Sequence, residues 1–341
     1  MNSRPQNPVA GPTERLRGET VVVAGGLGFI GLNLTAALLR AGARVRIINR
    51  TAKPQARRWL EQVDGGHAVE LVEGDIGDVA LLAPQVADAT LVINLAGESG
   101  AAKSLREAQR DTEVNVLAQI RLLDTIRETG NHPRLVFVSS RLVYGITGAE
   151  AASEAHPTRP TSLYGLHKLT VEHYYRLYWE HHGIPYTALR VTNPYGPYQL
   201  PERVQYGIVN RFVMAALAGE TLPLFGGGRQ LRDYLFVTDL VDAILLGATL
   251  DAGIGQTFNV GSGLPTSLRE VSQLIVELAG SGRVEVVPWP DSDRKVETGD
   301  FVCDTSRIAR LLGWQCGVPL REGLARTVEA YRALVGERRA Q

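Results

Sequence analysis

The chain contains 341 residues, 44% of them hydrophobic, which is enough to bury one large core or two closely joined ones. Its 36 Lys and Arg residues balance 36 Asp and Glu residues, so we expect no nucleic-acid partner and no binding to an anionic membrane. No apolar stretch has the length of a membrane span and the N-terminus lacks a signal pattern, which indicates a cytoplasmic protein. Cys303 and Cys316 do not have the spacing of metal ligands, and we expect no metal.

Strands and helices are expected to alternate through the first half of the chain. Glu19–Ala24 is rich in β-branched residues and predicts a strand, and after a glycine-rich turn the apolar residues of Phe29–Arg40 recur at helical spacing. The further expected strands are Arg44–Asn49, Val69–Glu73, Leu91–Leu95 and Leu135–Ser139, with one long helix over Lys103–Thr129. Because these strands are apolar throughout, the pattern predicts an α/β fold with a Rossmann-type, doubly wound parallel sheet.

The second half has more turns and a less regular order of elements. We expect a helix over Ser162–His182 and a strand over Tyr186–Val191, and then helices over Val204–Ala218, Thr238–Leu250, Ser267–Ala279 and Arg321–Val335. We divide the chain into a flexible N-terminal tail (1–18), a first domain (19–193, with later returns near 234–262) and an interleaved, smaller, mixed α/β second domain (194–341).

The turn between the first strand and the first helix reads Gly25-Gly26-Leu27-Gly28-Phe29-Ile30-Gly31, in the context that a dinucleotide-binding fingerprint requires. Gly25 permits the tight turn, Gly28 lets the backbone approach a pyrophosphate, and Gly31 lets the helix pack closely on the sheet. Phe29 and Ile30 open the helix, whose N-terminus then faces the negative charge. These residues are the first candidates for cofactor binding.

Residues after the next three strands extend this candidate site. Asn49 and Arg50 end the second strand, where an acid would contact the ribose of NAD; a guanidinium there can pair with the 2′-phosphate of NADP, or can be a solvated surface group. Asp75 and Ile76, after the third strand, are placed to meet the adenine. Leu95-Ala96-Gly97, after the fourth, offers a small flat surface to the nicotinamide ribose. We expect NAD and keep NADP open.

Tyr164 and Lys168 lie four residues apart on an expected helix and therefore share one face. An ammonium group beside the phenol favours the phenolate, a base that is otherwise scarce near neutral pH. Hydride removal from a secondary alcohol needs such a base, because the hydroxyl proton must leave as the hydride moves toward an oxidised nicotinamide. The pair therefore indicates an enzyme.

Together these motifs resemble the extended short-chain dehydrogenase/reductase superfamily, and within it the NAD-dependent nucleotide-sugar epimerase/dehydratase group (UDP-glucose 4-epimerase-like). The matching stretches are Gly25–Gly31, Asp75-Ile76, Asn94–Gly97, Val114–Val116, Ser139–Gly145, Tyr164–Lys168, Arg190–Pro197, Gln230–Tyr234 and Phe258–Gly261. The resemblance implies that Tyr164 is the catalytic acid/base, that Lys168 lowers its pKa and holds the nicotinamide ribose, and that Ser140 hydrogen-bonds the reacting sugar oxygen. It also implies a cofactor contact by Asn115, a dinucleotide-binding first domain and a substrate-binding second domain. A homodimer through the helices Lys103–Thr129 and Ser162–His182 is expected as well.

The resemblance places a UDP- or dTDP-hexose next to Asn193 and Arg232, and a guanidinium suits a diphosphate by forked hydrogen bonding. Glu297 stands roughly where the family commonly has a further arginine, so Arg294 or Lys295 is the candidate for the missing charge. Arg141 suggests a carboxylate on the sugar, or else points to solvent.

The stretch Ser140-Arg141-Leu142 separates the reactions of the group. The 4,6-dehydratases carry Thr-Asp-Glu there, because loss of water needs an acid and a base, and the decarboxylases carry a Glu at the Leu142 position. Arg141 and Leu142 supply neither group. The leading hypothesis is 4-epimerisation of an NDP-hexose through a transient 4-keto sugar with a retained nicotinamide cofactor. The alternatives are an NADPH-dependent 4-keto-sugar reductase and, with less support, a 4,6-dehydratase, a decarboxylase or a non-catalytic nucleotide sensor.

Overall fold

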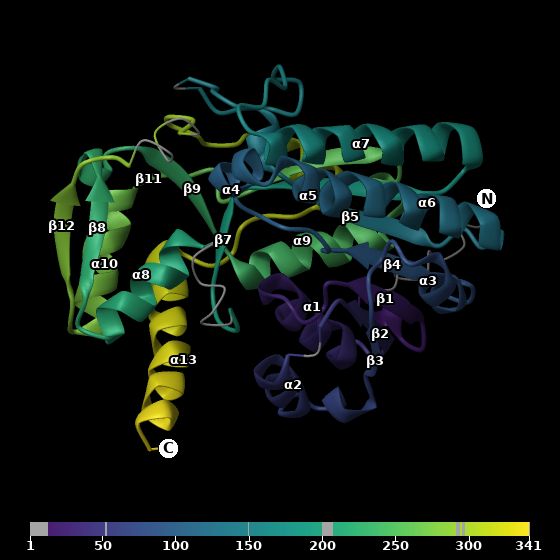
Figure 1. Ribbon diagram of the computed structural model, residues 1–341, viewed down its shortest axis with the longest axis horizontal. Coiled ribbons are helices and arrows are strands. Elements are labelled where there is room, and N and C mark those ends of the chain that lie inside the picture. Colours follow the sequence, from purple (N-terminus) through teal and green to yellow (C-terminus); the bar gives the residue numbers. More distant parts are fainter. Residues whose placement is uncertain are drawn as a thin grey trace, which may run out of the picture.

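A seven-stranded parallel sheet forms the centre of the computed structural model, which describes residues 13–51, 53–148, 150–199, 207–290, 294 and 297–340 (Figure 1). The strand order is β10-β6-β5-β4-β1-β2-β3. The strands are β1 (Thr20–Ala24), β2 (Arg44–Asn49), β3 (Glu70–Glu73), β4 (Leu91–Asn94), β5 (Arg134–Ser140), β6 (Tyr186–Val191) and β10 (Gln256–Val260). Their carboxyl ends share one edge, at which Ala24 pairs with Ile48 and Asn94. The strand order reverses between β1 and β4, and a crevice opens at such a point in this fold.

Helices cover both faces of the sheet, as the predicted doubly wound fold requires (Figure 1). Val21 and Val23 of β1 enter one core, and Val22 and Ala24 enter the other, because successive side chains of a strand point to opposite faces. The first core is closed by α1 (Phe29–Arg40), α2 (Pro54–Glu61), α9 (Val237–Thr249) and α12 (Ser306–Leu312). The second is closed by α3 (Val79–Val86), α6 (Ala118–Thr129) and α7 (Leu163–His182).

The expected single helix over Lys103–Thr129 is divided into several pieces. They are α4 (Ala101–Arg106), α5 (Ala108–Thr112), the π-helical turn η3 (Glu113–Leu117) and α6. Glu107 ends α4 with φ −122° and ψ 50°, outside the helical region. The π-turn presents Asn115 to the backbone of Glu98, which it binds through two hydrogen bonds of 3.0 Å. Helical spacing of apolar residues continues through these breaks, so the sequence pattern does not reveal them.

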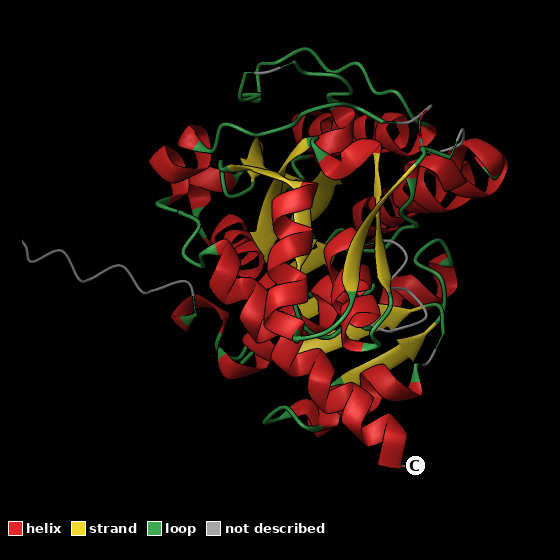
Figure 2. Cartoon of the chain, turned by 90° about the vertical axis from the view of Figure 1, so that its left-hand side faces the viewer, coloured by secondary structure: helices red, strands yellow, loops and turns green. Residues whose placement is uncertain are grey.

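A smaller second region has two short sheets, with orders β11-β9-β7 and β12-β8, and a core of its own. This region faces the viewer in Figure 2. Its strands are β7 (Asn193–Tyr195), β8 (Thr221–Phe225), β9 (Leu231–Phe236), β11 (Pro265–Ser267) and β12 (Arg283–Val287). Its helices are α8 (Ile208–Leu217), α10 (Leu268–Ala279) and α13 (Leu320–Ala340). Between these elements the chain returns to the large sheet through α9 and β10, so the two regions interleave. A domain boundary at residues 193 and 194 stays a prediction.

The flexible tail expected over residues 1–18 can be compared with the structure only from residue 13 onward, because residues 1–12 lie outside the described residues. Glu14–Leu16 forms the short 3-10 helix η1, and Leu16 is buried in the first core. Arg15 donates a hydrogen bond of 2.7 Å to the carbonyl of Thr249. The structure therefore places Glu14–Leu16 of the predicted tail within the fold. A single leucine among polar residues has no hydrophobic periodicity, so the sequence pattern does not reveal this contact. Within the described ranges, no helix is both long and apolar enough to cross a membrane.

Candidate active site

Two adjoining cavities lie at the carboxyl ends of the large sheet, where ligands bind in open parallel sheets. The outer cavity has a volume of about 560 Å³ and the inner cavity about 480 Å³. Predicted site residues that line the outer cavity are Asn49, Arg50, Asp75, Ile76 and Ala96. Those that line the inner cavity are Phe29, Ile30, Gly31, Ser140, Tyr164, Lys168 and Asn193. Both cavities share Gly25, Gly28, Leu95 and Gly97, so the two form one continuous site.

The glycine turn has the shape that a dinucleotide cradle needs. Gly25 has φ +82°, a conformation that favours glycine. A Cβ at Gly31 would lie 2.6 Å from the carbonyl oxygen of Gly25, so only glycine lets α1 start this close to the turn. Gly28 caps α1 without a side-chain hydrogen bond, which leaves the first-turn N–H groups facing the inner cavity. The described residues therefore fit a bound pyrophosphate.

The loop after β4 forms the wall between the two cavities. Asn115, from the π-turn, holds this loop through both backbone groups of Glu98, and a Cβ at Gly97 would lie 2.6 Å from its Oδ1. Gln119 donates a hydrogen bond of 3.2 Å to the carbonyl of Ala96. Asn115 is not among the described lining residues of either cavity, so the geometry gives it a role in positioning the loop.

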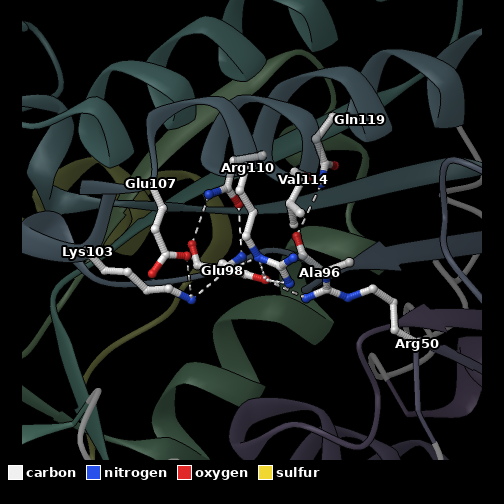
Figure 3. Close-up of polar contacts among 9 residues, drawn as sticks. Arg50, Ala96, Glu98, Lys103, Glu107, Arg110, Val114 and Gln119 are labelled. Atoms are coloured by element: carbon white, nitrogen blue, oxygen red, sulfur yellow. Dashed lines mark hydrogen bonds and ion pairs between the residues drawn. The ribbon is translucent and has the colours of Figure 1, made fainter. Parts of the chain in front are cut away.

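Glu98 lies at the centre of a cluster of charges across the outer cavity (Figure 3). Its carboxylate accepts hydrogen bonds from Arg50 at 3.0 Å, Lys103 at 2.7 Å and Arg110 at 2.7 Å. Partial burial raises the pKa of Glu98, but the hydrogen bonds from the three cations hold it down at about 2. Arg50 therefore reaches across the cavity mouth to Glu98 while its side chain stays 35% exposed. Sequence reasoning missed this cluster, because Arg50 is distant from the other members in sequence and the break between α4 and α5 sets the positions of Lys103 and Arg110.

Ser140, Tyr164 and Lys168 converge in the inner cavity from β5 and α7. Ser162 caps α7 by accepting a hydrogen bond of 3.2 Å from the N–H of Gly165, which fixes the first turn that carries Tyr164. Burial raises the pKa of Tyr164 to about 12, and a hydrogen bond with Ser140 opposes this rise. Burial lowers the pKa of Lys168 to about 8.

The Nζ of Lys168 lies 5.9 Å from the centre of the Tyr164 ring and donates a hydrogen bond of 2.8 Å to the carbonyl of Val138. The two side chains share a face of α7, as their spacing predicts. A role for Lys168 in lowering the pKa of Tyr164 stays a prediction. The sequence-predicted trio is nevertheless together in one cavity.

The predicted substrate residues divide into three groups. Asn193 lines the inner cavity and donates a hydrogen bond of 2.8 Å to the carbonyl of Asp233. Arg141 and Arg232 lie together beside the cavity, where Arg232 is paired with Glu297. Arg294 is exposed, and Lys295 lies outside the described residues. The role suggested for Arg294 stays a prediction.

Comparison with known proteins identifies the group to which this site belongs. Residues 21–261 match the NAD dependent epimerase/dehydratase family. The chain belongs to this family. It is 34% identical to UDP-glucose 4-epimerase of Mycolicibacterium smegmatis over 91% of this chain and 98% of the relative. It is 31% identical to dTDP-glucose 4,6-dehydratase of Xanthomonas campestris pv. campestris over 92% of this chain and 93% of the relative.

The solved structure of UDP-glucose 4-epimerase from Thermus thermophilus with NAD matches with a TM-score of 0.81 and 29% identity, covering 92% of this chain and 99% of that one. The predicted family, the α/β fold and an NAD-dependent enzyme that acts on nucleotide sugars are therefore confirmed. Family membership leaves the reaction open, because epimerases and dehydratases are about equally similar to the chain.

A buried polar network lies behind Ser140, Tyr164 and Lys168, and it was not predicted from the sequence of this member of the epimerase/dehydratase family. Glu172 of α7 binds Arg190 of β6 at 2.7 Å and accepts a hydrogen bond from Ser139. Arg190 also donates a hydrogen bond of 2.9 Å to the hydroxyl of Tyr144, which in turn donates one of 2.7 Å to Asn259. The network joins α7, β5, β6 and β10, and so fixes the backbone from which Ser140 and Tyr164 project.

Helix α7 also has a second buried anchor. Asp111 of α5 lies 2.6 Å from Nδ1 of His167, and Thr112 lies 3.3 Å from its Nε2. His167 stands between Tyr164 and Lys168 in sequence, so these contacts hold α5 against the turn of α7 that carries both. Among the described residues, no group of His, Cys, Asp and Glu side chains could hold a metal ion.

Proposed function

We propose that the protein is a nucleotide-sugar 4-epimerase, which inverts C4 of an NDP-hexose through a transient 4-keto sugar. The observation that carries the proposal is the chemistry of the inner cavity. Among its described lining residues the one carboxyl group is that of Glu98, which three cations hold as a carboxylate with a pKa of about 2. Loss of water from C5 and C6 needs an acid for the hydroxyl and a base for the C5 proton. A 4-epimerase needs neither group.

The three residues of the trio have separate roles in this reaction. When bound, the oxidised nicotinamide supplies a reversible hydride acceptor and a positive charge. Tyr164 takes the proton of the C4 hydroxyl and returns it after the sugar has turned over. Because its pKa is about 12, Tyr164 must first release its own proton to solvent before it can accept one, and the positive charges of Lys168 and of a bound oxidised nicotinamide would favour this phenolate. Ser140 hydrogen-bonds the C4 oxygen and the Tyr164 hydroxyl.

The walls of the inner cavity suit a hexose that must rotate. Leu142, Val191, Ile208 and Val209 contribute apolar surface there. Apolar side chains offer no directional hydrogen bonds, so they do not fix one orientation of the sugar hydroxyls. UDP- or dTDP-sugars are the proposed substrates, in line with the names of the relatives at 34% and 31% identity.

The first experiment is incubation of purified protein, with no added cofactor, against a panel of UDP- and dTDP-hexoses, with mass spectrometry and proton NMR of the products. We expect a product of unchanged mass with altered H4 couplings, and no turnover by Tyr164→Phe. A product lighter by one water would establish a dehydratase, and one lighter by carbon dioxide a decarboxylase. Either result would refute the epimerase proposal.

A 4-keto-sugar reductase is the second candidate, and Arg50 at the mouth of the outer cavity favours it. A guanidinium there suits the 2′-phosphate of NADPH. Release and chromatography of the bound nucleotide would identify NAD or NADP. If turnover of a 4-keto sugar requires added NADPH, and no panel hexose is epimerised, the reductase assignment replaces the epimerase.

We also propose a homodimer through α7 and the segment around η3. Leu166 and Leu177 on α7 are 46% and 39% exposed, and Leu117 at the end of η3 is 43% exposed. Apolar side chains on neighbouring helices are typical of a helical interface. Light scattering at micromolar concentration should give twice the chain mass, and Leu166→Glu with Leu177→Glu should give a monomer. A monomeric wild type would exclude the dimer.

A further inference from the structure

A cluster of charged and polar side chains lies beside the inner cavity, where the second region meets β5. It contains Arg141, Arg232, Tyr234 and Glu297, and we call it the arginine cluster. Arg232 is fully engaged: it donates to the carbonyls of Leu231 and Gly299 and is paired with Glu297. Its charge is therefore already neutralised inside the protein.

Arg141 is much less engaged. Its Nη1 donates one hydrogen bond of 3.1 Å to Thr298, and its guanidinium stacks 5.2 Å from the centre of the Phe301 ring. Burial, followed by the charge of Arg232, lowers the pKa of Arg141 to about 10. A guanidinium has five N–H donors, and one of those of Arg141 binds a described residue, so the part of the chain that the structure describes leaves further donors for a ligand.

Tyr234 adds a second available donor. Tyr234 is 5% exposed, and its hydroxyl has no hydrogen-bond partner among the described residues. In the parallel pairing of β7 and β9, Tyr234 stands opposite Asn193, which lines the inner cavity. Paired residues of neighbouring strands point to the same face, and Arg232 lies two residues earlier on that face. The hydroxyl therefore belongs to the side of the small sheet that faces the cavity.

The charge of the cluster favours a ligand with a single negative charge. Two guanidinium groups face one carboxylate, Glu297, which leaves one positive charge in excess. Asp233 offsets part of this excess, because its charge raises the pKa of Arg141, but it is the smallest of the causes, and its carboxylate accepts hydrogen bonds from Ser262, Gly263 and Cys303. A buried excess charge is stabilised most by an anion that also accepts the free hydrogen bonds. A diphosphate would bring more negative charge than the cluster can balance.

The position of Arg141 indicates which part of the substrate the anion belongs to. Arg141 directly follows Ser140, the residue assigned to the C4 oxygen, and its neighbours Ser140 and Leu142 both line the inner cavity. Consecutive Cα atoms lie about 3.8 Å apart, and C6 of a hexose lies two bonds from C4. A charged group on C6 is therefore within reach of the arginine next to Ser140.

We propose that the preferred substrate is a nucleotide-linked uronic acid, whose C6 carboxylate is held by Arg141 and Tyr234. This inference rests on the proposed 4-epimerase function and names its substrate class. Glu297 and Arg232 then act as a supporting pair that orients the cluster. A neutral hexose leaves the excess charge of Arg141 unpaired and binds less well.

The test compares UDP-glucuronic acid with UDP-glucose as substrates of the wild type, Arg141→Gln and Tyr234→Phe. We expect kcat/KM of the wild type to favour UDP-glucuronic acid by about 10-fold or more, because hydrogen bonds from Arg141 and Tyr234 to its charged carboxylate strengthen binding by about that factor. Arg141→Gln should lose about 10- to 100-fold with UDP-glucuronic acid, mostly in KM, and change less than threefold with UDP-glucose. Tyr234→Phe should show a smaller loss in the same direction. Arg283→Gln, on the exposed side of β12, is the matched control and should leave both activities unchanged.

Two results would overturn the uronic acid proposal while leaving the epimerase intact. One is a wild type that prefers UDP-glucose. The other is an equal loss with both sugars in Arg141→Gln, accompanied by weaker binding of UDP, which would assign the arginine to the diphosphate. If neither sugar is epimerised, the proposed function fails, and calorimetric binding of the two UDP-sugars to the wild type and Arg141→Gln still decides. Equal affinity of the wild type for both would refute the carboxylate site.

Discussion

Replacement of Lys168 by methionine should inactivate the protein and yet stabilise it. Burial lowers the pKa of Lys168 from 10.5 to about 8, so at neutral pH the folded chain carries an ammonium group in an unfavourable place. At 1.36 kcal/mol per unit, this costs about 3 kcal/mol relative to the unfolded chain. Methionine removes that cost but also the hydrogen bond to the carbonyl of Val138, worth about 1 kcal/mol. We therefore expect a net gain of about 2 kcal/mol at pH 7.

The pH dependence of this gain makes the reasoning refutable. Below pH 8 the lysine is charged in both the folded and the unfolded chain, and its cost is complete. Between pH 8 and 10.5 the folded chain loses the proton first, so the unfolded state binds more protons and the stability of the wild type rises with pH. Above pH 10.5 the lysine is neutral in both states and the cost has gone. The difference between Lys168→Met and the wild type should therefore shrink across this window.

The assay is urea unfolding of nucleotide-free protein at pH 7.5, 9 and 10, supported by melting temperatures, which we expect to rise by roughly 2–4 °C at pH 7.5. Tyr164→Phe serves as the control, because the pKa of Tyr164 rises from 10.0 to about 12 on folding, so its own effect on stability changes mainly above pH 10. A gain that stays constant from pH 7.5 to 10, or no gain at pH 7.5, would show that Lys168 is not strained by burial. Activity of Lys168→Met should fall by about 10²-fold or more.

Three further changes test the site and its support. Ser140→Ala should lower kcat by about 10²-fold, as loss of one donor to the reacting oxygen does, with NAD binding by fluorescence titration unchanged. Gly31→Ala brings a Cβ to 2.6 Å from the carbonyl oxygen of Gly25, so we expect a loss of about 1–3 kcal/mol in urea unfolding together with weaker NAD binding. Gly317→Ala, whose Cβ would make an ordinary contact of 3.6 Å, should change neither, and equal behaviour of the two variants would refute the cradle. Arg190→Met should destabilise by about 3–5 kcal/mol, because Glu172 is left buried without its partner; a loss below 1 kcal/mol in thermal unfolding would contradict this.

Elements with a strong apolar period could be predicted from the sequence almost to the residue. Phe29–Arg40, Arg44–Asn49 and Tyr186–Val191 are helix α1 and strands β2 and β6 with the expected bounds. Each is long enough to show its period and is bounded by turn residues. In contrast, β7 and β11 have only three residues each, and such short strands exist because of their neighbours.

The candidate site likewise contains parts that the sequence predicts and parts that it does not. The glycine turn and the Tyr164–Lys168 pair depend on local spacing, and the structure brings them into one cavity. The pairing of Arg50 with Glu98 and that of Arg232 with Glu297 join segments far apart in the chain, whereas Lys103 and Arg110 follow Glu98 across two helix boundaries. Charges of these types are common on solvated surfaces, so nothing local marks them as partners. Such contacts follow only from the fold.

The place of β10 at the edge of the large sheet has a consequence for synthesis of the chain. β6 ends at Val191, but its partner β10 begins at Gln256, after β7, β8, β9 and α9 have been made. At about 5–20 residues per second, the ribosome needs roughly 3–13 s to cover residues 192–255. During this interval β6 is an unpaired edge that can recruit the same strand of another nascent chain. Chaperone dependence of expression should therefore be greatest in variants that delay the docking of β10.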